Sequence, residues 1–203
     1  MKQIAFVGLC GLALIGCGSQ SETPAPAPTP VAKNDKAPDA KSGEASRRTV
    51  KTATDPDASK IDKAAKETTI EDIAAQKPPA GQLEGRSGPF ETTTWKVKAH
   101  LESIKLMKDD DYYLVLKGEK GGQTVVEVPN PDLCKGSPLQ PEIAAARKAL
   151  EERYHPTKDL KHLNDDATVT GVGFLGWNRS KKGATGKTGA RLMPGTGFEF
   201  NSK

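Results

Sequence analysis

The residues that most invite a binding role lie near the C-terminus, where basic side chains surround a tryptophan. Between Gly171 and Lys203 there are six basic residues and only one acidic residue, Glu199. An indole ring beside cations can stack on a base or a sugar while the cations neutralise phosphate or carboxylate groups. A solvated lysine-rich hairpin with an inward-packed tryptophan would have the same composition. The predicted binding residues are Trp177, Arg179, Lys181, Lys182, Lys187 and Arg191.

Three other patterns suggest catalysis or metal binding, and none of them is complete. Residues 109–111 are aspartates that could supply carboxylates, although such a run between strands is typical of a solvated turn. Residues 183–188 end like a phosphate-binding loop, but the glycine that this motif needs is replaced by Lys181. The histidines lack the spacing and cysteine partners of a metal site: His100, His155 and His162. We therefore expect no catalytic residues, no metal ion and no cofactor.

The N-terminus carries an export signal. A basic start, Met1-Lys2, precedes an apolar run over residues 4–15 that is too short to span a bilayer. The run closes on Leu14-Ile15-Gly16-Cys17, which resembles the lipobox of bacterial lipoproteins. This resemblance implies a signal peptide and lipobox over residues 1–17, and diacylation, as with palmitate, of the Cys17 sulfur before the signal is removed. An uncleaved or ordinary signal peptide is the alternative.

The residue after Cys17 bears on localisation. Gly18 does not resemble the aspartate that retains lipoproteins in the inner membrane, so we expect the outer membrane in a cell with two membranes. Once Cys10 is removed and Cys17 is acylated, only Cys134 remains as a thiol. The mature chain can then form no internal disulfide, and Cys134 is expected to be a small buried residue.

Residues 18–82 are predicted to form a disordered tether. No aromatic residue occurs between Phe6 and Phe90, so this stretch lacks side chains that could offset the entropy of ordering it. Residues 23–30 alternate proline with small residues, which favours extended polyproline II. Residues 58–76 have a thin apolar stripe and are expected to form only a transient helix. The tether is either a plain spacer or binds cell-wall polymer through its lysines.

Residues 83–203 are predicted to form a mainly β domain. Apolar and polar residues alternate from Trp95 to Leu101 and then change phase, so a bulge near Glu102-Ser103 should bend a long first strand. The further predicted elements are strands at 112–117 and 124–128, a helix at 141–154, a strand at 167–175, and a last strand at 190–193 and 197–200 interrupted at Pro194. Three strands, one helix and two strands are the order of a small five-stranded oligonucleotide/oligosaccharide-binding (OB) barrel.

The core of this domain is expected to come from the inward positions of the strands and from one face of the helix. Pro141 suits a first helical turn, and apolar residues recur at helical spacing behind it. The predicted core residues are Trp95, Val97, Leu114, Leu116, Val126, Ile143, Leu150, Val172, Phe174 and Phe198.

Several short motifs follow one another between Trp95 and Pro194. They are Trp95-x-Val97-x-Ala99, Asp109-x-Asp111-x-x-Leu114-Val115-Leu116, Glu127-Val128-Pro129, Ala146-Arg147 and Val169-Thr170-Gly171-Val172-Gly173-Phe174. In this order they resemble an uncharacterised bacterial family of secreted or lipid-anchored domains, and the resemblance implies an OB-like fold. The layout is also similar to the thermonuclease family, in which an Asp-containing turn follows the first strand. Where the first family has Glu-Leu-His-Pro, this chain has Arg191-Leu192-Met193-Pro194, so no role of that Glu or His carries over.

The sequence thus predicts a lipid-anchored cell-envelope protein that presents a non-catalytic OB-like binding or interaction domain. Its expected partners are the membrane, through the lipid on Cys17, and an anionic envelope polymer or another envelope protein. Nucleic acid is not expected, because the protein is exported. The alternatives are an oligonucleotide- or oligosaccharide-binding module and a degenerate or metal-dependent thermonuclease-like hydrolase. The latter would need arginines beside its carboxylates, and residues 121–134 contain none.

Overall fold

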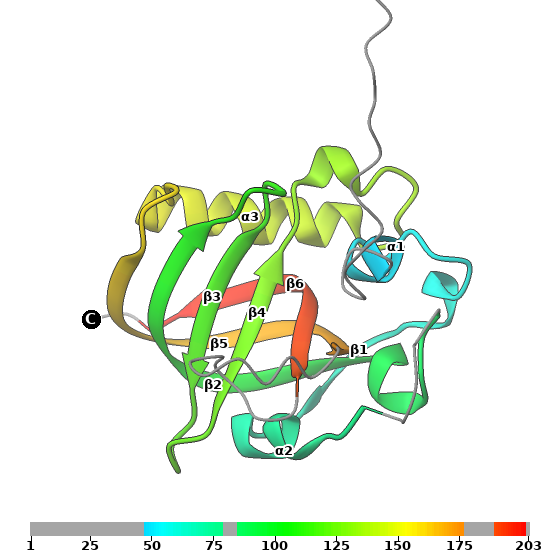
Figure 1. Cartoon of the computed structure of the whole chain (residues 1–203), viewed down its shortest axis with the longest axis horizontal. Coiled ribbons are helices and arrows are strands. Elements are labelled where there is room, and N and C mark those ends of the chain that lie inside the picture. Colours follow the sequence, from blue (N-terminus) through cyan, green and yellow to red (C-terminus); the bar gives the residue numbers. More distant parts are fainter. Residues whose placement is uncertain (1–46, 79–84, 177–188, 202–203) are drawn as a thin grey trace, which may run out of the picture. The chain divides into compact units, whose positions relative to one another are not determined.

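In the described part of the chain, six strands form one sheet that closes on itself (Figure 1). The computed structural model describes residues 47–78, 85–176 and 189–201. The strands are β1 (Asp62–Glu67), β2 (Thr93–Leu106), β3 (Tyr112–Lys117), β4 (Gln123–Val128), β5 (Lys161–Leu175) and β6 (Ala190–Phe200). Their order is β1-β2-β3-β4-β6-β5, and β5 also pairs with β2, so β2 to β6 complete a ring. The prediction of a mainly β domain is confirmed.

The ring is antiparallel except at one seam. β4 and β6 pair in parallel at Val126 and Leu192, because α3 and β5 intervene between them in the chain. β1 joins β2 in parallel from outside the ring. The predicted count of five strands is therefore too low by one, because β1 lies in the segment that lacks any alternating apolar pattern.

The long strand β2 bends as predicted. Its pairing with β3 and its pairing with β5 both change register between Leu101 and Ser103. An extra residue at this point turns the strand and increases its twist. As a result one strand contacts β1 near its start, β3 along its second half and β5 along most of its length.

The α-helices among the described residues are α1 (Arg48–Lys51), α2 (Ile70–Ala75) and α3 (Gln140–Tyr154). Short 3-10 turns occur at Ala58–Lys60, Pro89–Thr92 and Pro131–Leu133. The predicted helix is confirmed as α3, with Pro141 in its first turn. It ends at His155, whose backbone is left-handed with φ 46°. Its buried face packs against β6 and contains Ile143, Ala146, Leu150 and Tyr154. The prediction of a single helix missed α1 and α2, which precede the predicted domain.

The last two strands are longer than predicted. β5 begins at Lys161, because residues 161–166 continue the ladder with β2 although they are mostly polar and exposed. β6 runs without a break through Pro194. Its register against β5 shifts between Gly171, which pairs with Gly195, and Gly173, which pairs with Leu192. Pro194 lies at this shift, where its missing backbone N–H does not interrupt the pairing.

Most of the predicted core is confirmed. Eight of the ten residues are at most 1% exposed: Val97, Leu114, Leu116, Val126, Ile143, Leu150, Val172 and Phe174. Trp95 and Phe198 are only partly buried and pack against the core from its edge. Trp95 stacks on Phe90 with 5.6 Å between ring centroids and donates its indole N–H to the Phe90 carbonyl.

The predicted tether is wrong for residues 47–78, which belong to the folded domain. They contain α1, β1 and α2, and Val50, Ile70 and Ile73 are at most 1% exposed. A transient helix over residues 58–76 is also wrong, because a 3-10 turn, a strand and a short helix capped by Thr69 divide that stretch. The apolar residues of this segment are few and irregularly spaced, so the sequence shows neither a helical nor a strand period. Tertiary contacts nevertheless bury them. The rest of the predicted tether, and residues 1–17, lie outside the described residues.

Candidate functional site

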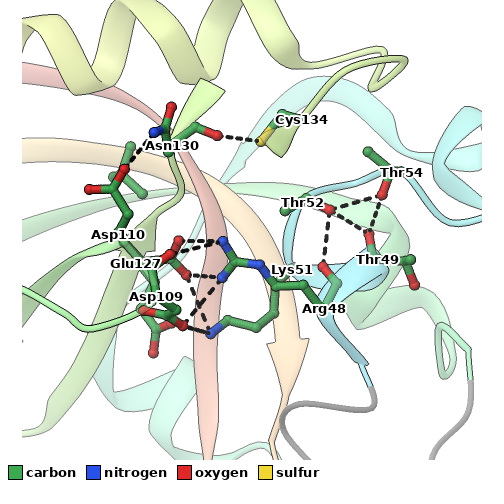
Figure 2. Close-up of polar contacts among 12 residues, drawn as sticks. Arg48, Thr49, Lys51, Thr52, Thr54, Asp109, Asp110, Glu127, Asn130 and Cys134 are labelled. Carbon is green, nitrogen blue, oxygen red and sulfur yellow. Dashed lines mark hydrogen bonds and ion pairs between the residues drawn. The ribbon is translucent and has the colours of Figure 1, made fainter. Parts of the chain in front are cut away.

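The aspartates of the β2–β3 turn are paired with basic side chains. Asp111 is fully buried and accepts two hydrogen bonds from the Arg48 guanidinium, the longer at 2.8 Å. Asp109 is half exposed and lies 3.3 Å from Arg48 (Figure 2). Asp110 accepts from Arg147 at 3.1 Å. The interpretation of residues 109–111 as a solvated turn is therefore wrong for the buried Asp111, whereas the Asp109 and Asp110 side chains stay about half exposed.

Lys51 extends this contact to the sheet. Its ammonium nitrogen lies 2.6 Å from Glu127 on β4 and 3.5 Å from Asp111. Arg191 on β6 also contacts Glu127, at 3.3 Å. We call the six residues with three positive and three negative charges the clasp: Arg48, Lys51, Arg191, Asp109, Asp111 and Glu127.

The local structure explains how the clasp forms. α1 has four residues, and Arg48 and Lys51 are three apart, so both side chains project from one face. Glu127 sits among buried valines of β4 and is itself only 6% exposed. A carboxylate at such a position requires partners, which α1 and β6 supply.

Burial and charge oppose each other within the clasp. Burial acts to lower the pKa of Lys51, but the carboxylates of Glu127 and Asp111 outweigh it and the pKa is raised. The pKa of Arg48 is likewise raised, because Asp111 outweighs desolvation. Burial raises the pKa of Glu127, against the opposing effect of Lys51 and Arg191. The cations therefore stay charged at neutral pH and occupy the oxygens that a metal or a substrate would need.

Two further buried ion pairs hold the first described residues against the rest of the domain. Arg47 contacts both oxygens of Glu91 at 2.8 and 2.9 Å, with side chains 3% and 0% exposed. The same guanidinium donates to the Leu175 carbonyl and lies 4.6 Å from the Phe174 ring centroid. Arg86 pairs with Asp55 at 2.8 Å and is also buried. These contacts join residues 47–55 to the start of β2 and the end of β5.

The predicted binding residues are not brought together by the described structure. Trp177, Arg179, Lys181, Lys182 and Lys187 lie outside the described residues, as does the predicted lipidation site Cys17. Arg191 is described, and it belongs to the clasp through Glu127. It packs against the sheet and is only about a fifth exposed.

The histidines take separate positions. His100 on β2 pairs with Asp166 on β5 at 2.9 Å, within a polar hollow of about 510 Å³. Lys98 and Lys117 also line this hollow, which adjoins a second hollow of about 280 Å³ beside α2. Acidic and basic groups alternate along both hollows. Within the described ranges, no group of three or more His, Cys, Asp or Glu side chains suits a metal ion.

Cys134 is fully buried, as predicted. Its thiol lies 3.4 Å from the Asn130 carbonyl (Figure 2). Burial raises the pKa of this thiol to about 11, despite nearby Arg48. The thiol is therefore protonated and a poor nucleophile at neutral pH.

Two features of the sequence point to the clasp, although neither belongs to an apolar period or a known motif. One is the basic group Arg47-Arg48 followed by Lys51, placed in a stretch that otherwise lacks order. The other is Glu127, an acidic residue inside an apolar strand. A buried charge in a strand predicts a distant partner of opposite sign, but it does not say which one.

Comparisons with known proteins leave the family open. No family model matches the chain. No curated protein matches it either. Among solved structures, asparaginyl-tRNA synthetase from Entamoeba histolytica is similar at 11% identity with a TM-score of 0.38. The match covers 69% of this chain and 24% of the synthetase, a similarity too low to support an inference about function. No helix in the described part of the chain is long and apolar enough to cross a membrane.

Proposed function

We propose that this protein is a lipid-anchored cell-envelope protein whose β domain serves binding or interaction rather than catalysis. One observation carries the second part of this proposal: the carboxylates of the β2–β3 turn are neutralised by cations of the same chain. A thermonuclease-like hydrolase would use such carboxylates for a metal and its arginines for phosphate. Here two arginines reach the turn, and each holds a carboxylate instead: Arg48 contacts Asp111 and Arg147 contacts Asp110.

The topology supports an OB-like barrel as the fold of this domain. The ring runs β2-β3-β4-β6-β5, its seam between β4 and β6 is parallel, and α3 lies between β4 and β5 in the chain. Three strands, a helix and two strands in this order, with a bent first strand, are the elements that a small closed OB-like barrel would contain. Such barrels bind oligonucleotides or oligosaccharides through their loops, so an envelope polymer or another envelope protein suits the domain as a partner.

The N-terminal sequence supports the anchor. Leu14-Ile15-Gly16-Cys17 closes the apolar run, and the polar sequence that follows begins with Gly18, which favours the outer membrane in a cell with two membranes. Because the folded domain includes residue 47, the predicted tether shortens to residues 18–46. A flexible chain of this length has a root-mean-square reach of about 30 Å. The domain would therefore stay near the bilayer.

The anchor is tested by changing Cys17→Ala and measuring partition of the full chain between detergent and aqueous phases. We expect the variant to remain as precursor or to appear in the aqueous phase, because no acyl chain can be attached. Cys10→Ala and Cys134→Ala are matched controls that should partition like the unchanged chain. Equal partition of Cys17→Ala and the unchanged chain would refute the anchor.

The non-catalytic part is tested by a hydrolase screen. The chain from Gly18 onward is assayed on phosphodiester and glycoside substrates with and without divalent cations. We expect no turnover above background. Metal-dependent hydrolysis that disappears in Asp111→Asn would establish the hydrolase alternative and contradict the proposal.

A further inference from the structure

An apolar hollow of about 500 Å³ lies at the end of β2. Leu106 and Met107 form its apolar part, and three lysines surround it: Lys105, Lys108 and Lys158. The acidic residue that also lines the hollow, Asp109, is already paired with Arg48 in the clasp. The hollow therefore combines apolar surface with three lysines that make no ion pair with another described residue.

Two large apolar side chains near this hollow are exposed. Met107, which lines the hollow, is 37% exposed, and Leu160, which follows Lys158 by two residues, is 52% exposed. The α3–β5 loop is held against the end of β2 by a 2.8 Å hydrogen bond from the Leu106 amide to the Thr157 carbonyl. Leu160 directly precedes Lys161, which pairs with Ile104 of β2. Both exposed side chains thus belong to the same end of the domain.

The β2–β3 turn beside the hollow is joined to α1. Arg48 contacts Asp109, which belongs to this turn (Figure 2). The first described residue, Arg47, instead contacts Glu91 and Leu175 at the start of β2 and the end of β5.

We propose that this end of the domain docks on the surface of an anionic phospholipid bilayer. Lysines attract anionic headgroups, while their methylene chains and nearby apolar side chains can enter the boundary between headgroups and acyl chains. The contact set consists of Lys105, Lys108, Lys158, Met107 and Leu160. This inference rests on the proposed lipid anchor, which would hold the contact set near the bilayer at a high effective concentration.

The opposite end of β3 lacks these properties. There Lys98, Lys117 and Lys120 line the two polar hollows together with Glu119. Lys117 also pairs with Glu102 at 3.8 Å. Acid beside base leaves little net attraction for an anionic surface, so these three lysines form a matched control for the contact set.

The test is co-sedimentation with vesicles. The chain from Gly18 onward, which keeps every described residue and lacks Cys17, is mixed with vesicles of phosphatidylglycerol and phosphatidylcholine or of phosphatidylcholine alone. We expect binding to the anionic vesicles only, weakened by salt. Changing Lys105, Lys108 and Lys158 together to Gln should weaken binding on the order of 100-fold. The control with Lys98, Lys117 and Lys120 changed to Gln should lose less than about tenfold, since those residues lie far from the bilayer.

A second variant tests the apolar part of the contact. Met107→Gln with Leu160→Gln should weaken binding while the unfolding midpoint stays near that of the unchanged chain, because both side chains are exposed. Equal binding to both vesicle types, full binding by the triple lysine variant, or equal losses in the control would overturn the proposal. So would capture of soluble partner protein with no vesicle binding. If vesicle binding is absent while Cys17→Ala still leaves the detergent phase, the docking surface is wrong and the lipid anchor stands. If vesicle binding is present while Cys17→Ala partitions like the unchanged chain, the lipid anchor is wrong and the docking surface stands.

Discussion

The ring of strands and the segment 47–78 reach similar burial by different means. In the ring, alternate residues of β3 such as Leu114 and Leu116 are completely buried and face one core. In the segment, Arg47, Lys51 and Asp55 are at most 8% exposed although they are charged. The first region is ordered by an apolar period. The second is ordered by ion pairs with residues between 86 and 127 and by a few buried apolar side chains such as Ile70 and Ile73. Absence of an apolar period therefore does not establish disorder.

The two regions also differ in what their contacts require. An apolar side chain packs against whichever apolar surface lies opposite, so a ring strand tolerates many neighbours. A buried charge needs one partner of opposite sign at hydrogen-bond distance, and losing it leaves an uncompensated charge. If this contrast is correct, single substitutions in the segment should be as costly as cavities in the core.

The largest loss is expected for Glu91→Ala. This change removes the carboxylate that holds the buried Arg47 and that accepts from the Leu175 amide. Leaving Arg47 buried without its partner should lower the free energy of unfolding by about 3–5 kcal/mol, measured by denaturant titration. Glu199→Ala is the control, because Glu199 is exposed and reaches only Lys96 at 3.5 Å. If the two variants showed equally small losses of unfolding free energy, the ion pair between Arg47 and Glu91 would not stabilise the fold.

The next loss is expected for Ile73→Ala in α2. Ile73 is 1% exposed and belongs to the core cluster that includes Leu116 of β3. Both Ile73→Ala and Leu116→Ala should cost about 2–5 kcal/mol, because each leaves a cavity in the same core. The measurement is thermal or denaturant unfolding of the two variants side by side. A silent Ile73→Ala beside a damaging Leu116→Ala would show that the segment is not part of the core.

Substitutions of two aspartates in the β2–β3 turn should lower the free energy of unfolding by smaller and unequal amounts. Asp111→Asn weakens a fully buried acceptor of the Arg48 guanidinium and should cost about 1.5–3 kcal/mol. Asp109→Asn, at a half-exposed position, should cost less than about 1 kcal/mol. Unfolding free energies of the two variants provide the comparison. Equal and small effects would restore the interpretation of this turn as merely solvated.

The ring was predictable because its residues repeat locally. The bulge of β2, the limits of β3 and the buried face of α3 each follow from the spacing of apolar residues within a few positions. The start of β5 was missed, because residues 161–166 are polar and pair with β2 only once the sheet has formed. The exposed strand β1 was missed for the same reason.

The clasp was not predictable to the same degree. Arg48 and Asp111 are 63 positions apart, and nothing in the local sequence of either residue specifies the other. Pro-rich, lysine-rich sequence before residue 47 also suggested that the disordered composition continued to residue 82. Glu127 was the usable signal, since a carboxylate within a buried strand needs a cation from elsewhere. Pairing that cation correctly required the three-dimensional structure.

Amide hydrogen exchange tests most directly the central claim that residues 47–78 are folded with the ring. The amides of Thr68 and Ile73 donate to Lys96 and Thr69 at 3.0 and 3.1 Å. We expect them to exchange only by opening events that also expose β3 amides such as that of Leu116, with similar opening free energies. Exchange of Thr68 and Ile73 at the rate of an unstructured peptide, while Leu116 stays protected, would contradict the account.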